Sequence, residues 1–257
     1  MKWLLAIAGL VAADAAAAQE QLRFVTCPIY RDTDAGRKSG CWLADDPVSG
    51  IRYDVTNAPT KPDYGHAVLV EGIVAPAGDT ALCGGTVLDP VRTSILSERC
   101  TRHMLPAEGH PGRRFTLPPR NVAPVSVARS APERPYANRT FSLVYDFGRN
   151  FIVYQLDDYI LDQAISWIRA VNPRRILVTG HAATSPATVS GRTLRERPEL
   201  ARERAERITE ALVRLGVTRD RITTRWRTGA RPSPVDGADG LIEPSRRRVD
   251  IDILDPE

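Results

Sequence analysis

A strand-like apolar run, residues 176–178, leads directly into Gly180 and His181 and then into small and polar residues. An apolar run that meets a glycine predicts a strand ending in a loop, and such loops often carry functional side chains. The next positions, Ala182 and Ala183, hold no acid. No second histidine lies near His181 in sequence, so we expect it to form hydrogen bonds rather than to bind a metal.

Three common catalytic patterns are missing from the sequence. It contains no Gly-x-Ser-x-Gly, no His-Glu-x-x-His and no glycine-rich phosphate loop. Asp32 and Asp34 do not complete a calcium loop, because no acid stands at the twelfth position counted from Asp32. We therefore expect a protein that is not an enzyme and that carries no cofactor and no metal.

The charge of the chain is mild and mixed. The 257 residues include 35 basic and 31 acidic side chains, and only Lys2, Lys38 and Lys61 among the basic ones are lysines. The arginines stand among acids everywhere except in the block at 245–249. A nucleic-acid partner would favour an unbroken basic surface, so we expect none.

The N-terminus is typical of an exported protein. A positive start at Met1-Lys2 precedes an apolar run at 3–13, and the small residues at 16–18 fit a cleavage site. This pattern predicts a signal peptide over 1–18 and a mature chain beginning at Gln19, although a buried N-terminal helix is an alternative. No other apolar run is long enough to span a membrane, so no transmembrane helix is expected after cleavage.

The cysteines agree with export. There are four, all in the first half: Cys27, Cys41, Cys83 and Cys100. Without a close Cys-x-x-Cys pair they favour two disulfides over a zinc site. Three pairings are possible, and we favour the local one, in which the first cysteine joins the second and the third joins the fourth. Each bond would close a loop of about 15 residues, worth about 3 kcal/mol.

The pattern of the chain predicts an α+β protein of two domains. Residues 19–118 carry short β-branched and aromatic runs separated by turn residues, which indicates a small barrel or sandwich stapled by disulfides. A proline-rich linker over 119–138 follows. Residues 139–257 then alternate strands and amphipathic helices in the order β-α-β-α-β-β, typical of two helices on one face of a mixed sheet.

The second helix of this unit is predicted over 198–216. It begins near Pro198, ends at Gly216 and carries an apolar stripe that would face the core. The stripe is Leu200, Ala201, Ala205, Ile208, Leu212 and Leu215. In the last strand, 247–254, the alternation places Val249, Ile251 and Ile253 inward.

This order resembles the OmpA-like C-terminal domain. Three segments carry the resemblance: Gly180-His181 after the second strand, Leu200–Ala205 in the second helix, and Arg246–Ile251 entering the last strand. It covers about 139–254, and the N-terminal half lies outside it. The resemblance implies a periplasmic or outer-membrane-associated protein of the Gram-negative cell envelope that binds peptidoglycan.

The resemblance also implies where the ligand would bind. In the family, an aspartate after Gly-His and an arginine of the helix hold the ammonium and the carboxylate of diaminopimelate in the stem peptide, chemistry that suits those two side chains. The family's aspartate falls on Ala183, and its threonine on Ala182. The implied ligand-binding positions are Gly180, His181, Ala183, Arg204, Arg247 and Arg248.

Three alternatives follow from the missing acid. Glu196 or Glu199 could fold back from the long loop to replace it, or binding could rest on Arg204 and Arg247 alone. The domain could also have lost the ligand and serve as a scaffold that binds envelope proteins. Since Arg204 should flank the apolar stripe, we expect its truncation to weaken binding while leaving folding unchanged.

Overall fold

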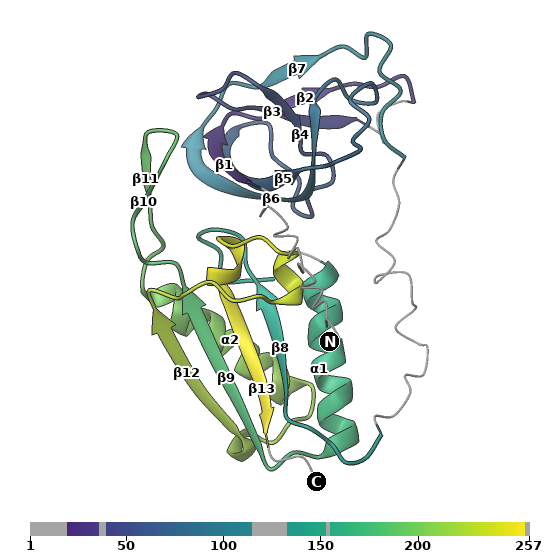
Figure 1. Cartoon of the computed structure of the whole chain (residues 1–257). Helices are drawn as coiled ribbons and strands as arrows, with labels where there is room; N and C mark the ends of the chain where they lie inside the picture. Colours follow the sequence, from purple (N-terminus) through teal and green to yellow (C-terminus); the bar gives the residue numbers. More distant parts are fainter. Residues whose placement is uncertain (1–19, 36–39, 115–132, 153–154, 255–257) are drawn as a thin grey trace, which may run out of the picture.

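The computed structural model describes residues 20–35, 40–114, 133–152 and 155–254. The expected signal peptide and residues 119–132 of the expected linker lie outside these ranges. Two sheets account for most of the strands, one in each half of the chain, and two helices belong to the second half (Figure 1). The α+β prediction is therefore confirmed.

The first sheet forms what we call the β domain. It curls strongly in space (Figure 1) and has the order β1-β5-β6-β4-β3-β2-β7. Its strands are β1 (Gln21–Thr26), β2 (Ile29–Arg31), β3 (Cys41–Asp45), β4 (Arg52–Asp54), β5 (His66–Val74), β6 (Thr86–Arg99) and β7 (His103–Leu105). The long strand β6 pairs with β5 along most of its length and with β4 at its start, so it joins the two halves of the sheet.

All four cysteines form disulfides, but the favoured local pairing is wrong. The structure joins Cys27 to Cys100 and Cys41 to Cys83. Strands β1 and β6 both run antiparallel to β5, so their ends meet beside its start, and a cysteine follows each of them. Strand β4 likewise pairs with β3, which opens with a cysteine, and with the start of β6, which another cysteine precedes. Sheet order therefore decides the pairing, and proximity in sequence does not.

The C-terminal domain has the predicted order of strands and helices, with one addition. Its main elements are β8 (Arg139–Val144), α1 (Gln155–Val171), β9 (Arg175–Ala182), α2 (Glu199–Arg214), β12 (Ile222–Thr228) and β13 (Arg248–Leu254). The sheet order is β12-β9-β13-β8, with β9 and β12 parallel and β13 antiparallel to its two neighbours. The addition is a hairpin, β10 (Ala187–Val189) and β11 (Arg192–Leu194), which fills the long loop between β9 and α2. It extends toward the β domain (Figure 1).

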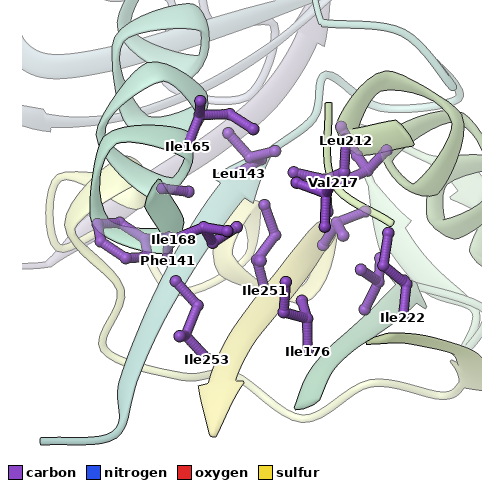
Figure 2. Close-up of a cluster of buried hydrophobic side chains, with 14 of the residues drawn as sticks. Phe141, Leu143, Ile165, Ile168, Ile176, Leu212, Val217, Ile222, Ile251 and Ile253 are labelled. Atoms are coloured by element: carbon purple, nitrogen blue, oxygen red, sulfur yellow. The ribbon is translucent and has the colours of Figure 1, made fainter. Parts of the chain in front are cut away.

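One apolar core joins this sheet to both helices (Figure 2). The predicted inward residues of β13 are fully buried, as period-two alternation requires. The apolar residues of α1 and α2 close the cluster from the same face of the sheet. The described part of the domain also contains three short turns of 3-10 helix: η2 (Arg219–Arg221), η3 (Asp236–Ala238) and η4 (Pro244–Arg246).

The end of α2 has a Schellman geometry. Gly216 has a φ of +99°, its N–H donates to Val213, and the N–H of Val217 donates to Leu212. The predicted stop at Gly216 is therefore confirmed. The prediction that Leu215 belongs to the core stripe is wrong: this residue is 44% exposed, because it is the C-cap and lies past the last helical turn.

Among the described residues, no helix is long and apolar enough to cross a membrane. The same residues contain no cluster of three or more histidine, cysteine, aspartate or glutamate side chains that could hold a metal ion.

Candidate functional site: two arginines that bind carboxylates

Gly180 brings strand β9 and helix α2 into close contact. A Cβ built at this position would lie 2.0 Å from the carbonyl oxygen of Ala201 and 3.0 Å from Ala205. Only glycine fits such an approach of two backbones. The start of α2 is thereby held against the end of β9, which is where the resemblance places the ligand.

Arg204 lies at this contact and is completely buried. Its guanidinium donates to the backbone oxygens of His181 and Arg149, each at 2.8 Å. It also donates two hydrogen bonds to the carboxylate of Glu196, at 2.6 and 2.9 Å. The ring of Tyr145 lies below the guanidinium, 5.0 Å away between centroid and Cζ. The expectation that Arg204 flanks the stripe is therefore wrong: it is a core residue of α2, because the chain supplies it with a buried carboxylate.

Glu196 is held as a bound carboxylate would be. Besides Arg204, the backbone N–H groups of Ala183 and Gly148 donate to it, both at 2.9 Å. Burial raises the pKa of Glu196, but hydrogen bonding and the charge of Arg204 outweigh burial, with help from Arg247, and keep that pKa below its usual value. Glu196 therefore stays ionised inside the protein.

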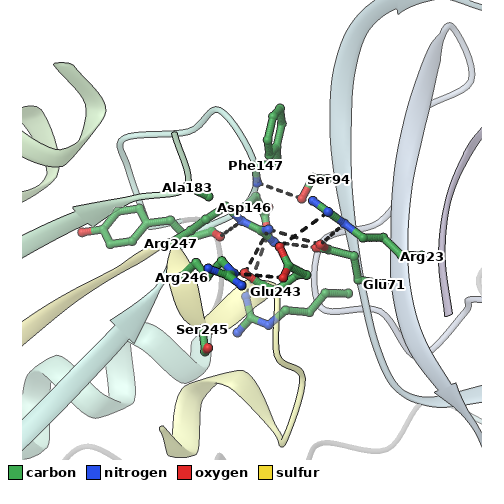
Figure 3. Close-up of polar contacts among 12 residues, drawn as sticks. Arg23, Glu71, Ser94, Asp146, Phe147, Ala183, Glu243, Ser245, Arg246 and Arg247 are labelled. Atoms are coloured by element: carbon green, nitrogen blue, oxygen red, sulfur yellow. Dashed lines mark hydrogen bonds and ion pairs between the residues drawn. The ribbon is translucent and has the colours of Figure 1, made fainter. Parts of the chain in front are cut away.

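Arg247 binds a second carboxylate, and this one comes from the β domain (Figure 3). Its guanidinium donates to Glu71 at 2.5 and 3.2 Å and to the backbone oxygens of Tyr145 and Glu243. Burial acts to lower the pKa of Arg247, but Glu71 outweighs burial and leaves that pKa above its usual value. The side chain of Arg247 is fully buried.

The remaining predicted side chains point elsewhere. Arg248 donates to Asp250 at 2.9 Å, and His181 Nε2 lies 2.9 Å from the same carboxylate. Burial raises the pKa of Asp250, but its polar neighbours outweigh burial and leave it lowered. The structure thus brings together Arg204, the backbone of His181 and the N–H of Ala183, while the His181 and Arg248 side chains belong to a separate group.

Glu196 does fold back to the site, as one alternative expected. Its carboxylate is bound to Arg204 and is not free to receive an ammonium, while Glu199 lies exposed at the start of α2. Glu71 was missed by the sequence analysis. A signal was available, because Glu71 is the single charged residue in the apolar run 67–74, and an acid there needs a partner.

The comparisons with known proteins agree with the resemblance. The model of the OmpA family matches residues 147–240, so this part of the chain is OmpA-like. The match includes Gly180, Ala183 and Arg204 and ends before Arg247. A search of curated proteins found no match.

The search of solved structures matched three bacterial proteins, among others. The OmpA-like domain of FopA1 from Francisella tularensis is 16% identical, with a TM-score of 0.36, over 46% of this chain and 73% of that one. The cell wall anchor of the T6SS from Pseudomonas aeruginosa is 19% identical, with a TM-score of 0.35, over 47% and 82%. The periplasmic domain of Helicobacter pylori MotB is 21% identical, with a TM-score of 0.32, over 45% and 79%.

Proposed function

We propose that this protein is exported to the cell envelope, where its OmpA-like domain binds peptidoglycan non-covalently through a carboxylate of the stem peptide. The family resemblance names the ligand. The observation that carries the proposal is the convergence of Arg204 and two backbone N–H groups on the carboxylate of Glu196, at the position where the resemblance implies the ligand. The proposal includes the predicted division into a signal peptide over 1–18, a β domain, a linker and a C-terminal domain.

The receptor suits the chemistry of the proposed ligand. A guanidinium binds a carboxylate through two parallel hydrogen bonds, and backbone N–H groups add directional donors. Diaminopimelate presents both a carboxylate and an ammonium. The carboxylate would take the place of Glu196 on Arg204, whereas Ala183 offers the ammonium no acid. We therefore expect weaker binding than a site with both partners would give.

Co-sedimentation of the full-length protein with purified peptidoglycan tests the proposal. Ala183→Asp puts a carboxylate at the position where the family has its aspartate. The negative charge of this side chain should also repel Glu196 from Arg204. We expect this change to tighten binding by about ten- to a hundredfold, the effect of one charge-assisted pair. Thr184→Asp places the same charge one residue along and should change little. If wild type and Ala183→Asp both stay in the supernatant, the proposal is wrong.

Export has its own test. Mass spectrometry of the protein purified from its native host should find a chain that begins at or near Gln19. A native chain that retains Met1 would contradict the predicted signal peptide, whatever the peptidoglycan assay shows.

A second candidate function is a scaffold that binds envelope proteins and has lost the ligand. The complete burial of Arg204 and Arg247 favours it, because both arginines already hold parts of the chain together. This candidate predicts no sedimentation with peptidoglycan, and none after Ala183→Asp. It also predicts a protein partner that crosslinks to the C-terminal domain in intact cells.

A further inference from the structure

A row of alternating charges crosses the face of the β domain that meets the C-terminal domain. In the sheet register, Glu71 of β5 pairs with Arg23 of β1 on one side and with Arg92 of β6 on the other. Directly paired residues of neighbouring strands point to the same side of a sheet. The row therefore presents a cation, an anion and a cation side by side.

The C-terminal domain presents the opposite sequence of charges to this row. Arg23 lies 3.5 Å from Glu243 and Glu71 lies 2.5 Å from Arg247 (Figure 3). Arg92 lies 3.9 Å from Asp146. The last two pairs are almost completely buried. A shift of the row by one residue would bring like charges into contact, so the row disfavours that register and favours the observed docking.

Hydrogen bonds around the row add polar contacts to the interface, and an apolar cluster of Val25, Ala67, Leu69 and Val189 also crosses it. Arg92 donates to the backbone oxygen of Gly237 at 2.6 Å, and Thr60 donates to Asp146 at 2.6 Å. A second row of contacts joins the hairpin β10–β11 to the β domain, including an ion pair between Arg192 and Glu98 at 2.7 Å. This apolar cluster is small beside the core of either domain, and relative motion of two domains is expected unless their interface is large and apolar.

Separation of the domains would affect the two central charges differently. Glu71 would keep Arg23, whose Nε donates to it at 3.1 Å from the neighbouring strand of the same domain. Arg247 would lose the single carboxylate that it contacts among the described residues, and would keep only backbone oxygens. An open protein therefore presents the Arg247 guanidinium with no directly bound carboxylate, within electrostatic range of Glu196 and Asp146.

We infer that the β domain is a built-in lid of the OmpA-like site, and that a carboxylate of the ligand competes with Glu71 for Arg247. The inference rests on the proposed function and gives the β domain a part in it. In the closed form Glu71 occupies Arg247, and the domains part when a peptidoglycan carboxylate takes its place. Peptidoglycan binding and domain opening are then coupled, and each favours the other.

Glu71→Gln in the full-length chain tests the lid with two readouts. The native cysteines are all in disulfides, so nitroxide labels can be placed at Val48→Cys and Leu215→Cys, both exposed and on different domains. We expect the distance distribution between the labels to broaden and sedimentation with peptidoglycan to tighten about tenfold or more. Glu98→Gln is the matched control, because it removes an exposed interdomain carboxylate and leaves Arg247 covered.

A locked variant keeps the inference falsifiable if Glu71→Gln disturbs folding. A short bis-maleimide crosslink between Glu98→Cys and Arg192→Cys ties the hairpin to the β domain. The crosslinked chain should sediment with peptidoglycan about tenfold less well than the same chain before crosslinking. Equal sedimentation of locked and free chains would overturn the lid.

The outcomes separate the lid from the proposed function. If wild type sediments and Glu71→Gln changes neither readout, the lid is refuted and peptidoglycan binding stands. If Glu71→Gln broadens the distances while no variant sediments with peptidoglycan, the proposed function has failed, and the inference that rests on it fails too.

Discussion

Replacing Glu196 by glutamine should severely destabilise the C-terminal domain. The carboxylate accepts hydrogen bonds from Arg204 at 2.6 and 2.9 Å and from the N–H groups of Ala183 and Gly148 at 2.9 Å. Both charged side chains are completely buried. Glutamine keeps the shape but leaves the arginine charge unpaired and turns an NH₂ group toward donors. Breaking a buried pair in this way costs about 3–5 kcal/mol, a large part of the 5–15 kcal/mol that stabilises a typical domain.

Urea unfolding monitored by circular dichroism measures the loss. The matched control is Glu206→Gln, which removes the carboxylate of an exposed pair with Arg202 on the same helix. That pair should contribute no more than about 1 kcal/mol. The reasoning is refuted if Glu196→Gln at pH 7 lies within about 0.5 kcal/mol of wild type, or if the two variants lose the same stability.

The pH dependence gives a second check of the same pair. The pKa of Glu196 is lower in the folded protein than in the unfolded chain, so ionised Glu196 contributes stability above its unfolded pKa. That contribution falls away as the pH drops below about 4. The difference in unfolding free energy between wild type and Glu196→Gln should therefore shrink on acidification.

Three further predictions concern other parts of the fold. Burial raises the pKa of Asp157 to about 7, so the folded state loses stability as the pH rises from about 4 to 7. Asp157→Asn should therefore raise the unfolding free energy by up to about 4 kcal/mol at pH 8 and by little at pH 4. Equal effects of the substitution at the two pH values would contradict this. Gly180→Ala would force its Cβ against the carbonyl of Ala201 and should cost about 1–3 kcal/mol; an unchanged melting temperature would argue against the close contact. Non-reducing peptide mapping should recover Cys41 linked to Cys83, and a link from Cys41 to any other cysteine would show that the sheet order is wrong.

Local patterns were enough to predict the elements of the C-terminal domain. The alternation in β13 and the glycine that ends α2 each reflect short-range physical constraints, so Ile251 and Gly216 could be placed from the sequence. The disulfides could not be paired in this way. Their pairing depends on which strands flank β5 and β4, and that arrangement is set by contacts between residues far apart in the chain.

The two buried arginines mark the limit of the sequence analysis. Within its stretch of charged residues, Arg204 has the spacing of a core position and the chemistry of a surface one. Its burial requires the carboxylate of Glu196, which lies between the hairpin β10–β11 and the start of α2. The partner of Arg247 is farther still, in another domain, and helical or strand periodicity contains no information about such a pair.

The central claim is that Arg204 and Arg247 are each bound to a carboxylate of the chain itself. Proton exchange at the arginine side chains, measured by nuclear magnetic resonance on the full-length protein, tests it most directly. The Nε–H of Arg204 donates to Arg149 and that of Arg247 to Tyr145. Both N–H signals should persist long after transfer of the protein to D₂O, whereas the signal of the exposed Arg225 should be lost at once. Glu71→Gln should accelerate exchange at Arg247 far more than at Arg204. Exchange at Arg204 and Arg247 as fast as at Arg225 in the wild-type protein would contradict the account.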